Sequence, residues 1–251
     1  MKTAINFFRF IYSIYALILF VAIMLLIFPF VMIASFFGIK GGHEIYKLCS
    51  LWSRLWYAGI GMTHHEIYES PHDRNRQYIF VGNHISYMDI PPIVLAIHQP
   101  VRVLGKYEMV KIPVFGWIYR SAVILVDRRN AEQRAKSVRA LKAAIAKGIS
   151  IFLFPEGTFN ESEKPLKDFY DGAFRIAIES QTPIKPILLI DTLERMHFKS
   201  VFSLSPGKNR VVYLDEIDVS SYTMKEVNQL KEKVYLLMEE GLKRYRNYPQ
   251  A

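Results

Sequence analysis

A histidine and an aspartate stand five residues apart in the segment Asn83-His84-Ile85-Ser86-Tyr87-Met88-Asp89, directly after an apolar, strand-like run at residues 77–82. Open α/β sheets form their ligand crevices where strands end, so His84 is expected at such an edge. A turn of this length would bring the Asp89 carboxylate to one ring nitrogen of His84, leaving the other nitrogen to take a proton from a hydroxyl group. The spacing alone leaves a purely structural role for His84 open, because His64 and Glu69 share it without a preceding strand.

A second polar segment follows another buried-strand pattern. Residues 151–158 read Ile-Phe-Leu-Phe-Pro-Glu-Gly-Thr. Proline ends strand pairing, glycine allows a close backbone approach, and Glu156 and Thr158 supply polar groups at the strand end. Taken alone, the segment also fits an ordinary hairpin-like loop.

Cysteine usage and motif searches exclude several kinds of chemistry. The single cysteine, Cys49, rules out an internal disulfide, a CxxC redox pair and a cysteine-rich zinc site, and no Gly-x-Ser-x-Gly nucleophile elbow occurs. One local cluster contains possible metal ligands, but ligands adjacent on an apparent surface strand rarely form one closed site, so we expect no metal. This cluster comprises His64, His65, Glu66, Glu69 and His72.

The elements that must position these residues have the pattern of a single α/β domain, residues 62–251. Short apolar runs typical of buried strands alternate with amphipathic helical patterns. The helical patterns cover residues 131–147 and a C-terminal stretch from Met224 to Leu242. The expected strands are at residues 77–82, 101–106, 122–127, 149–154, 184–190 and 210–214.

The N-terminal part, residues 1–61, differs in composition. Residues 10–37 contain no charge, and as a straight helix they would measure about 42 Å against a hydrocarbon core of about 30 Å. Pro29 is expected to kink or break this helix, so residues 30–38 would turn back and make the segment re-entrant; a single span is the alternative. Residues 43–61 mix tryptophan, tyrosine and basic residues, which suits a helix in the headgroup layer or an amphipathic helix packed on the domain.

Positive charge is concentrated in one stretch. The chain carries a net charge of +9, of which residues 102–147 contribute +8. This stretch fits a solvated helix face, or attachment to an anionic bilayer together with capture of a phosphorylated substrate. Nucleic acid is a poor candidate partner, because no nucleic-acid recognition motif is present and nucleic-acid-binding proteins rarely carry an apolar membrane segment.

Together the motifs resemble the glycerolipid acyltransferases, in particular the bacterial lysophosphatidic acid acyltransferases. The resemblance covers residues 83–190 in four ordered blocks: Asn-His-x-x-x-x-Asp, Asp127-Arg128, Phe-Pro-Glu-Gly-Thr and Pro183-Ile184-Lys185-Pro186. It implies an α/β fold with a central mixed sheet flanked by helices. It also implies attachment to the cell inner membrane by the N-terminal segment, with the catalytic domain on the cytoplasmic side.

The resemblance implies transfer of a fatty acyl group from acyl-CoA or acyl carrier protein to the sn-2 hydroxyl of lysophosphatidic acid, giving phosphatidic acid for phospholipid synthesis. His84 would be the general base and Asp89 its orienting partner. No metal or other cofactor is implied; the partners are membrane lipids and the acyl donor. The substrate-binding residues implied by the resemblance are Asn83, Ser86, Lys106, Arg128, Glu156, Gly157 and Thr158.

The chain departs from the family pattern at Phe159, where the family usually has an arginine thought to bind the phosphate of the acceptor. An aromatic ring cannot supply the two parallel hydrogen bonds of a guanidinium group. The acceptor is therefore either lysophosphatidic acid held by other basic residues or a phosphate-free lysolipid such as a lyso-aminolipid. Two further hypotheses are a membrane thioesterase or lipase that uses the same His-Asp pair, and a non-catalytic lipid tether.

Overall fold

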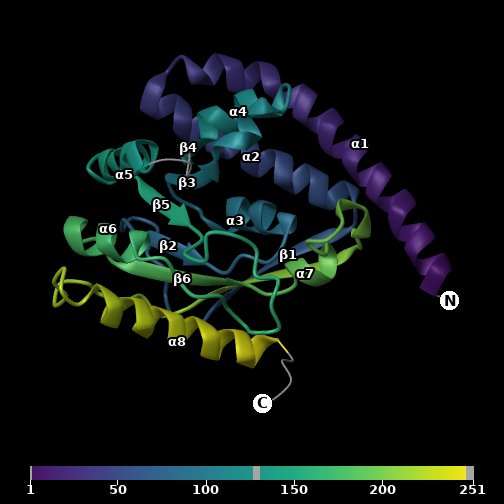
Figure 1. The fold of residues 1–251 in the computed structure, drawn as a ribbon. Helices are drawn as coiled ribbons and strands as arrows, with labels where there is room; N and C mark the ends of the chain where they lie inside the picture. The colour runs from purple at the N-terminus through teal and green to yellow at the C-terminus, as the bar shows by residue number, and fades with distance from the viewer. Residues whose placement is uncertain (1, 127–130, 247–251) are drawn as a thin grey trace.

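The computed structural model describes residues 2–126 and 131–246, in which seven strands form one sheet flanked by helices (Figure 1). The sheet order is β1-β7-β6-β2-β5-β3-β4. Strands β6, β2, β5, β3 and β4 are mutually parallel, while β7 is antiparallel to β6 and parallel to β1. The sheet is therefore mixed, as predicted. The strands are β1 (Met62–Tyr68), β2 (Ile79–Gly82), β3 (Val101–Lys106), β4 (Val123–Val126), β5 (Ser150–Leu153), β6 (Ile184–Leu189) and β7 (Gly207–Tyr213).

Six strands coincide with the apolar runs predicted from the sequence, with ends that differ by up to three residues. The seventh, β1, lies at the edge of the sheet and has the polar sequence Met-Thr-His-His-Glu-Ile-Tyr. An edge strand is buried on fewer sides, so it needs no continuous apolar run. Sequence analysis accordingly indicated only a surface strand there.

Alternating side chains along the strands supply two cores. Ile79 and Val81 of β2 face α5 (Ala131–Ile145), α6 (Gly172–Ser180) and α8 (Val227–Tyr245). Phe80 faces the opposite side, which α3 (Ile90–Ala96) covers. The remaining short elements are η1 (Tyr87–Asp89), η2 (Tyr107–Lys111), α4 (Phe115–Ala122), α7 (Thr192–Arg195) and η3 (Val201–Ser203).

Helices α1 (Lys2–Ser35) and α2 (Gly38–Gly59) form an antiparallel hairpin over the α3 side of the sheet (Figure 1). Pro29 lies inside α1, so the helix does not break at that residue: it continues to Ser35, and the chain reverses at Phe36 and Phe37, within the stretch 30–38 where a reversal was predicted. Within a helix, proline removes one hydrogen bond, and packing against a neighbour can offset that loss. Residues 5–35 are long and apolar enough to cross a membrane.

Helix α2 is packed between α1 and the domain. Trp52 and Trp56, expected at a headgroup layer in one interpretation, are each only 6% exposed. Their indole nitrogens donate hydrogen bonds to the carbonyl oxygens of Phe20 (3.1 Å) and Ala16 (2.8 Å) in α1. The amphipathic helix packed on the domain is therefore the interpretation that the structure supports. The division of the chain at residue 61 stays a prediction.

Gly82 is the last residue of β2 and packs closely against β5 just before the His84 segment. A Cβ at this position would lie 2.8 Å from Cζ of Phe152, a fully buried ring on β5. We expect Gly82→Ala to lower the free energy of unfolding by about 1–3 kcal/mol through overpacking, measured by denaturant unfolding in detergent micelles. Gly172→Ala is the matched control, because a Cβ there has no neighbour within 4 Å. Equal stability of the two variants would contradict the packing argument.

Candidate active site

The two polar segments meet at one edge of the sheet because β2 and β5 are parallel neighbours. Their register pairs Ile79 with Ile151 and Phe80 with Phe152. Equal numbers of residues after these pairs lead to His84 and Glu156, so both segments leave the sheet at the same level. The structure thus brings together the histidine and the glutamate that are 72 residues apart in the chain.

His84 and Asp89 form a hydrogen-bonded pair, with 2.8 Å between Nδ1 and Oδ2. The same carboxylate oxygen accepts hydrogen bonds from the backbone N–H groups of Ile85 (2.8 Å) and Ser86 (2.9 Å). Ser86 caps the short helix η1 by accepting from the N–H of Met88, which fixes the turn. Asp89 is fully buried and rigidly held, so the His84 ring is oriented through Nδ1 and its Nε2 is left for a substrate.

Aromatic rings hold the His84 imidazole on two sides. The ring of Phe154 stacks on it with centroids 3.8 Å apart and planes 11° apart, and Phe159 meets it edge-on at 4.4 Å. Tyr87, which is exposed, meets Phe159 at 4.7 Å. Only 15% of the His84 side chain is exposed. The sequence pattern singles out Phe159 but gives no role to Phe154 or Tyr87. The place of Phe154 becomes apparent only from the β2–β5 register, which continues to residue 154 beside residue 82.

Glu156 connects the two segments through the backbone. Its Oε1 accepts from the N–H of His84 (2.7 Å), and its Oε2 accepts from the N–H of Lys167 (2.8 Å). The carbonyl oxygen of His84 accepts from the N–H of Asn160 (2.7 Å), so the His84 backbone is held on both sides. Glu156 is 1% exposed, and this burial raises the pKa of its carboxyl to about 7 despite the two N–H donors. In this geometry Glu156 positions His84; its role in binding substrate stays a prediction.

Asn83 and Ser86, also predicted to bind substrate, are buried and bonded to the main chain. The amide of Asn83 donates to the carbonyl oxygen of Leu189 (3.0 Å) and accepts from its N–H (2.7 Å), which extends the pairing of β2 with β6 by one residue. The hydroxyl of Ser86 donates to the carbonyl oxygen of Met196. Both side chains therefore fix the backbone around His84, and direct contact with substrate stays a prediction.

Of the remaining predicted residues, Thr158 and Lys106 are exposed and Gly157 is buried. Gly157 has a φ of +73°, which its lack of a side chain permits. Thr158 is exposed and accepts a hydrogen bond from Nζ of Lys167 (2.8 Å). Lys106 is exposed at the carboxyl end of β3, at the same edge of the sheet. Arg128 lies outside the described residues.

Part of the cluster of possible metal ligands lies on β1 and is hydrogen-bonded within the chain. The Glu66 carboxylate is bonded to Nε2 of His64 (3.1 Å) and Nε2 of His98 (2.8 Å). Residues 2–126 and 131–246 contain no group of three ligands arranged to hold a metal ion.

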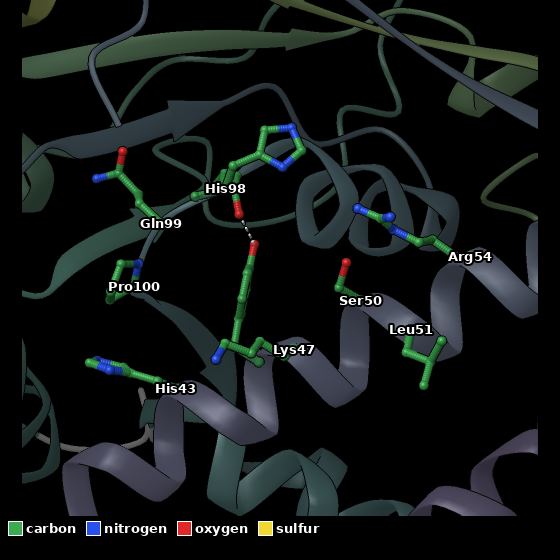
Figure 2. A pocket seen from close by; sticks show the side chains of 10 residues that line it. His43, Lys47, Ser50, Leu51, Arg54, His98, Gln99 and Pro100 are labelled. Carbon is green, nitrogen blue, oxygen red and sulfur yellow. Dashed lines mark hydrogen bonds between the residues drawn. The ribbon is translucent and has the colours of Figure 1, made fainter. Parts of the chain in front are cut away.

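A cavity of about 410 Å³ lies away from His84, between α2 and the segment that follows α3. Figure 2 shows Lys47, Ser50 and Arg54 along α2 on one side of this cavity and His98 and Gln99 on the other.

Comparisons with known proteins agree with this architecture. The family model described as Acyltransferase matches residues 62–190. The 1-acyl-sn-glycerol-3-phosphate acyltransferase of Haemophilus influenzae is 29% identical over 215 residues, which is 84% of this chain and 86% of that protein. The enzymes of the same name from Salmonella typhimurium and Escherichia coli are 31% and 29% identical, each over 65% of this chain and 66% of their own.

A solved structure confirms the fold. The crystal structure of the 1-acyl-sn-glycerophosphate (LPA) acyltransferase PlsC from Thermotoga maritima superposes with a TM-score of 0.75 over 97% of both chains, at 21% sequence identity. The mixed sheet, the flanking helices and the helical hairpin are thus a known arrangement. Because the family model covers more than half of the chain and ends with β6, past both polar segments, the chain belongs to the acyltransferase family.

Proposed function

We propose that this acyltransferase moves a fatty acyl group from acyl-CoA or acyl carrier protein to the sn-2 hydroxyl of lysophosphatidic acid. The observation that carries the proposal is the 2.8 Å hydrogen bond between Nδ1 of His84 and Asp89, which leaves Nε2 free at the edge of the sheet. The bacterial relatives named 1-acyl-sn-glycerol-3-phosphate acyltransferases support this acceptor. The product is phosphatidic acid, a precursor for phospholipid synthesis.

The reaction needs one general base. Nε2 of His84 takes the proton of the acceptor hydroxyl while the oxygen of that hydroxyl attacks the thioester carbonyl carbon. The tetrahedral intermediate then expels the thiolate, which recovers the proton from the imidazolium, and an ester bond has replaced the thioester bond. A thioester is already activated, so no covalent nucleophile is needed. Cys49 is unsuited to that role, because burial in the hairpin raises the pKa of its thiol to about 12.

The contacts around the base suit general-base catalysis. The face of Phe154 lies against the His84 ring, where its π electrons interact favourably with the imidazolium that forms during the reaction. The Asp89 carboxylate adds attraction from the Nδ1 side. Phe154 and Phe159 also limit the access of water to the ring, which favours a lipid hydroxyl over hydrolysis.

Basic groups near the site fit a phosphate on the acceptor. Lys167 bonds to Thr158, and Lys106 ends the neighbouring strand. These two lysines supply positive charge in a chain that has Phe159 in place of the family's arginine. The contact of Phe159 with His84 favours the second candidate, acylation of a phosphate-free lyso-aminolipid, because an apolar ring lies against the base where the family usually has an arginine.

Membrane attachment by α1 would place the site near its lipid acceptor. Large apolar side chains, including Leu17 and Ile18, are exposed along this helix. Soluble proteins rarely expose an apolar patch of this kind. We infer that the protein is held at the bacterial inner membrane by the hairpin, with the sheet domain on the cytoplasmic side, where acyl-CoA and acyl carrier protein are found.

A transfer assay tests the function. Purified protein is incubated with labelled acyl-CoA or acyl carrier protein and either lysophosphatidic acid or a lyso-aminolipid. We expect labelled phosphatidic acid to form fastest, and His84→Gln to reduce the rate by about 10²–10⁴-fold because the general base is lost.

Each other outcome has a distinct meaning. Faster acylation of the lyso-aminolipid would support the second acceptor. Release of free fatty acid regardless of acceptor would indicate a thioesterase or lipase. Near-normal turnover by His84→Gln, or no turnover of any thioester by the wild type, would overturn the mechanism.

The raised pKa of Glu156 predicts a pH dependence of stability. A carboxyl group with a pKa of about 7 in the folded state and an ordinary value of 4.5 favours folding below about pH 4.5 and loses this contribution as the pH rises through 7. The free energy of unfolding should fall by up to roughly 1.4 kcal/mol per pH unit over this interval because of Glu156. Glu156→Gln, which does not titrate, should lack this part of the slope; equal slopes in denaturant unfolding would contradict the assignment.

The exposed face of α1 predicts how the protein partitions. Each lysine placed at the centre of a membrane helix costs about 2.5–3.5 kcal/mol, so Leu17→Lys/Ile18→Lys should move the protein from the membrane pellet toward the supernatant. Met224→Lys/Leu236→Lys is the control, since both side chains are exposed and lie outside the hairpin: Met224 precedes α8, and Leu236 lies on it. Wild-type protein in the supernatant after cell lysis would refute the anchor.

A further inference from the structure

The second carboxylate oxygen of Asp89 has no hydrogen-bond partner among the described residues. Oδ2 accepts three hydrogen bonds, but Oδ1 accepts none from the described part of the chain, and the residue is fully buried. A buried acceptor without a donor costs about 1–3 kcal/mol, and more when it is charged. Native structures usually satisfy such an atom with an ordered water molecule.

Tyr57 in α2 offers a donor nearby. Its side chain is 3% exposed, and its hydroxyl oxygen accepts from Nδ2 of Asn209 on β7 (2.8 Å). No acceptor for the hydroxyl hydrogen is found among residues 2–126 and 131–246. Burial raises the pKa of Tyr57 well above its usual value, and the charge of Asp89 raises it further. Tyr57 therefore keeps its proton, and it lies within electrostatic range of Asp89.

Two more unpaired atoms come from other elements. Thr192, the first residue of α7, is fully buried, and its hydroxyl has no partner within the described ranges; α7 packs against η1, which contains Asp89. Asn209 is also fully buried, and its Oδ1 is unpaired. The N–H of Arg210 bonds to Asp191 (2.9 Å), so the start of α7 adjoins this part of β7.

The four groups match the bonding capacity of one water molecule. A water donates two hydrogen bonds and accepts two, and buried waters typically make about three. The carboxylate oxygen of Asp89 and the amide oxygen of Asn209 are acceptors, whereas the hydroxyls of Tyr57 and Thr192 can donate. These groups come from η1, β7, α2 and α7, elements far apart in the sequence.

We propose that a buried water molecule joins Oδ1 of Asp89 to the hydroxyls of Tyr57 and Thr192 and to Asn209, so that Tyr57 is a positioning residue for the His84–Asp89 pair. With both oxygens bonded, the carboxylate keeps one orientation while His84 gains and loses its proton. The inference rests on the proposed role of His84 as general base. It also makes α2, part of the membrane hairpin, a component of the active-site support.

Tyr57→Phe tests the proposal, because it removes the hydroxyl and keeps the ring. We expect kcat to fall by about 10-fold with KM nearly unchanged, as is typical when an outer partner of a functional group is lost. The control is Tyr46→Phe, also on α2, whose hydroxyl donates to the carbonyl oxygen of Ile97 (2.9 Å) at the far end of α3. It should keep wild-type kcat with a comparable change in thermal stability.

The pH profile gives a readout that a structural defect would not produce. Losing donors to Asp89 strengthens its attraction for a protonated His84, so the acidic limb of kcat/KM should move to higher pH in Tyr57→Phe but not in Tyr46→Phe. The titratable groups around His84 are Asp89, Glu156 and Tyr57, with Lys167 beyond Glu156. All except Tyr57 are the same in the two variants.

Thr192 provides an independent check. Thr192→Val removes the hydroxyl at constant shape and should lower kcat and move the acidic limb as Tyr57→Phe does, whereas Thr192→Ser should restore both. Unchanged kcat and pH profile in Tyr57→Phe and Thr192→Val would overturn the inference, as would equal effects in Tyr46→Phe. Failure of the proposed function is distinguishable, since the wild type would then transfer no acyl group.

Discussion

The parallel pairing of β2 with β5 is the constraint on which the candidate site depends. It brings two polar segments to the same edge at the same level, so that Glu156 reaches the backbone of His84. A shift of one residue in this register would turn the side chains after the strands to opposite faces of the sheet. The close fit between Gly82 and the Phe152 ring helps to hold the register, because a larger residue would push the two strands' side chains apart.

Two buried carboxylates hold His84, one through its ring and one through its backbone. Asp89 orients the ring through Nδ1, and Glu156 holds the peptide group of the same residue. Burying two acids so close together is costly, and backbone N–H groups offset much of that cost: two are bonded to Asp89 and two to Glu156. Phe154 and Phe159 complete the enclosure with apolar surface. The arrangement suits the general-base role that we propose for His84, whose side chain is only 15% exposed.

The helical hairpin has two different faces. The outer face of α1 exposes large apolar side chains, while α2 packs against α3, and its Tyr57 is buried and bonded to Asn209 of β7. The side chains of Trp52 and Trp56 bond to the backbone of α1, so the two helices are held together by specific contacts as well as by apolar packing. In the two proposals made above, attachment to a membrane and support of the candidate site are both assigned to this one hairpin.

The amino-acid sequence by itself determined the six apolar strands, the pair His84 and Asp89, and the apolar segment, because apolar runs, local spacing and absence of charge are properties of neighbouring residues. Only the tertiary structure decided that Glu156, Asn83 and Ser86 bond to the backbone, that Phe154 stacks on His84, and that α1 continues past Pro29. These outcomes depend on strand register and helix packing, which join residues distant in sequence. Local patterns carry no information about such contacts, since the energy that selects them arises only when the elements meet.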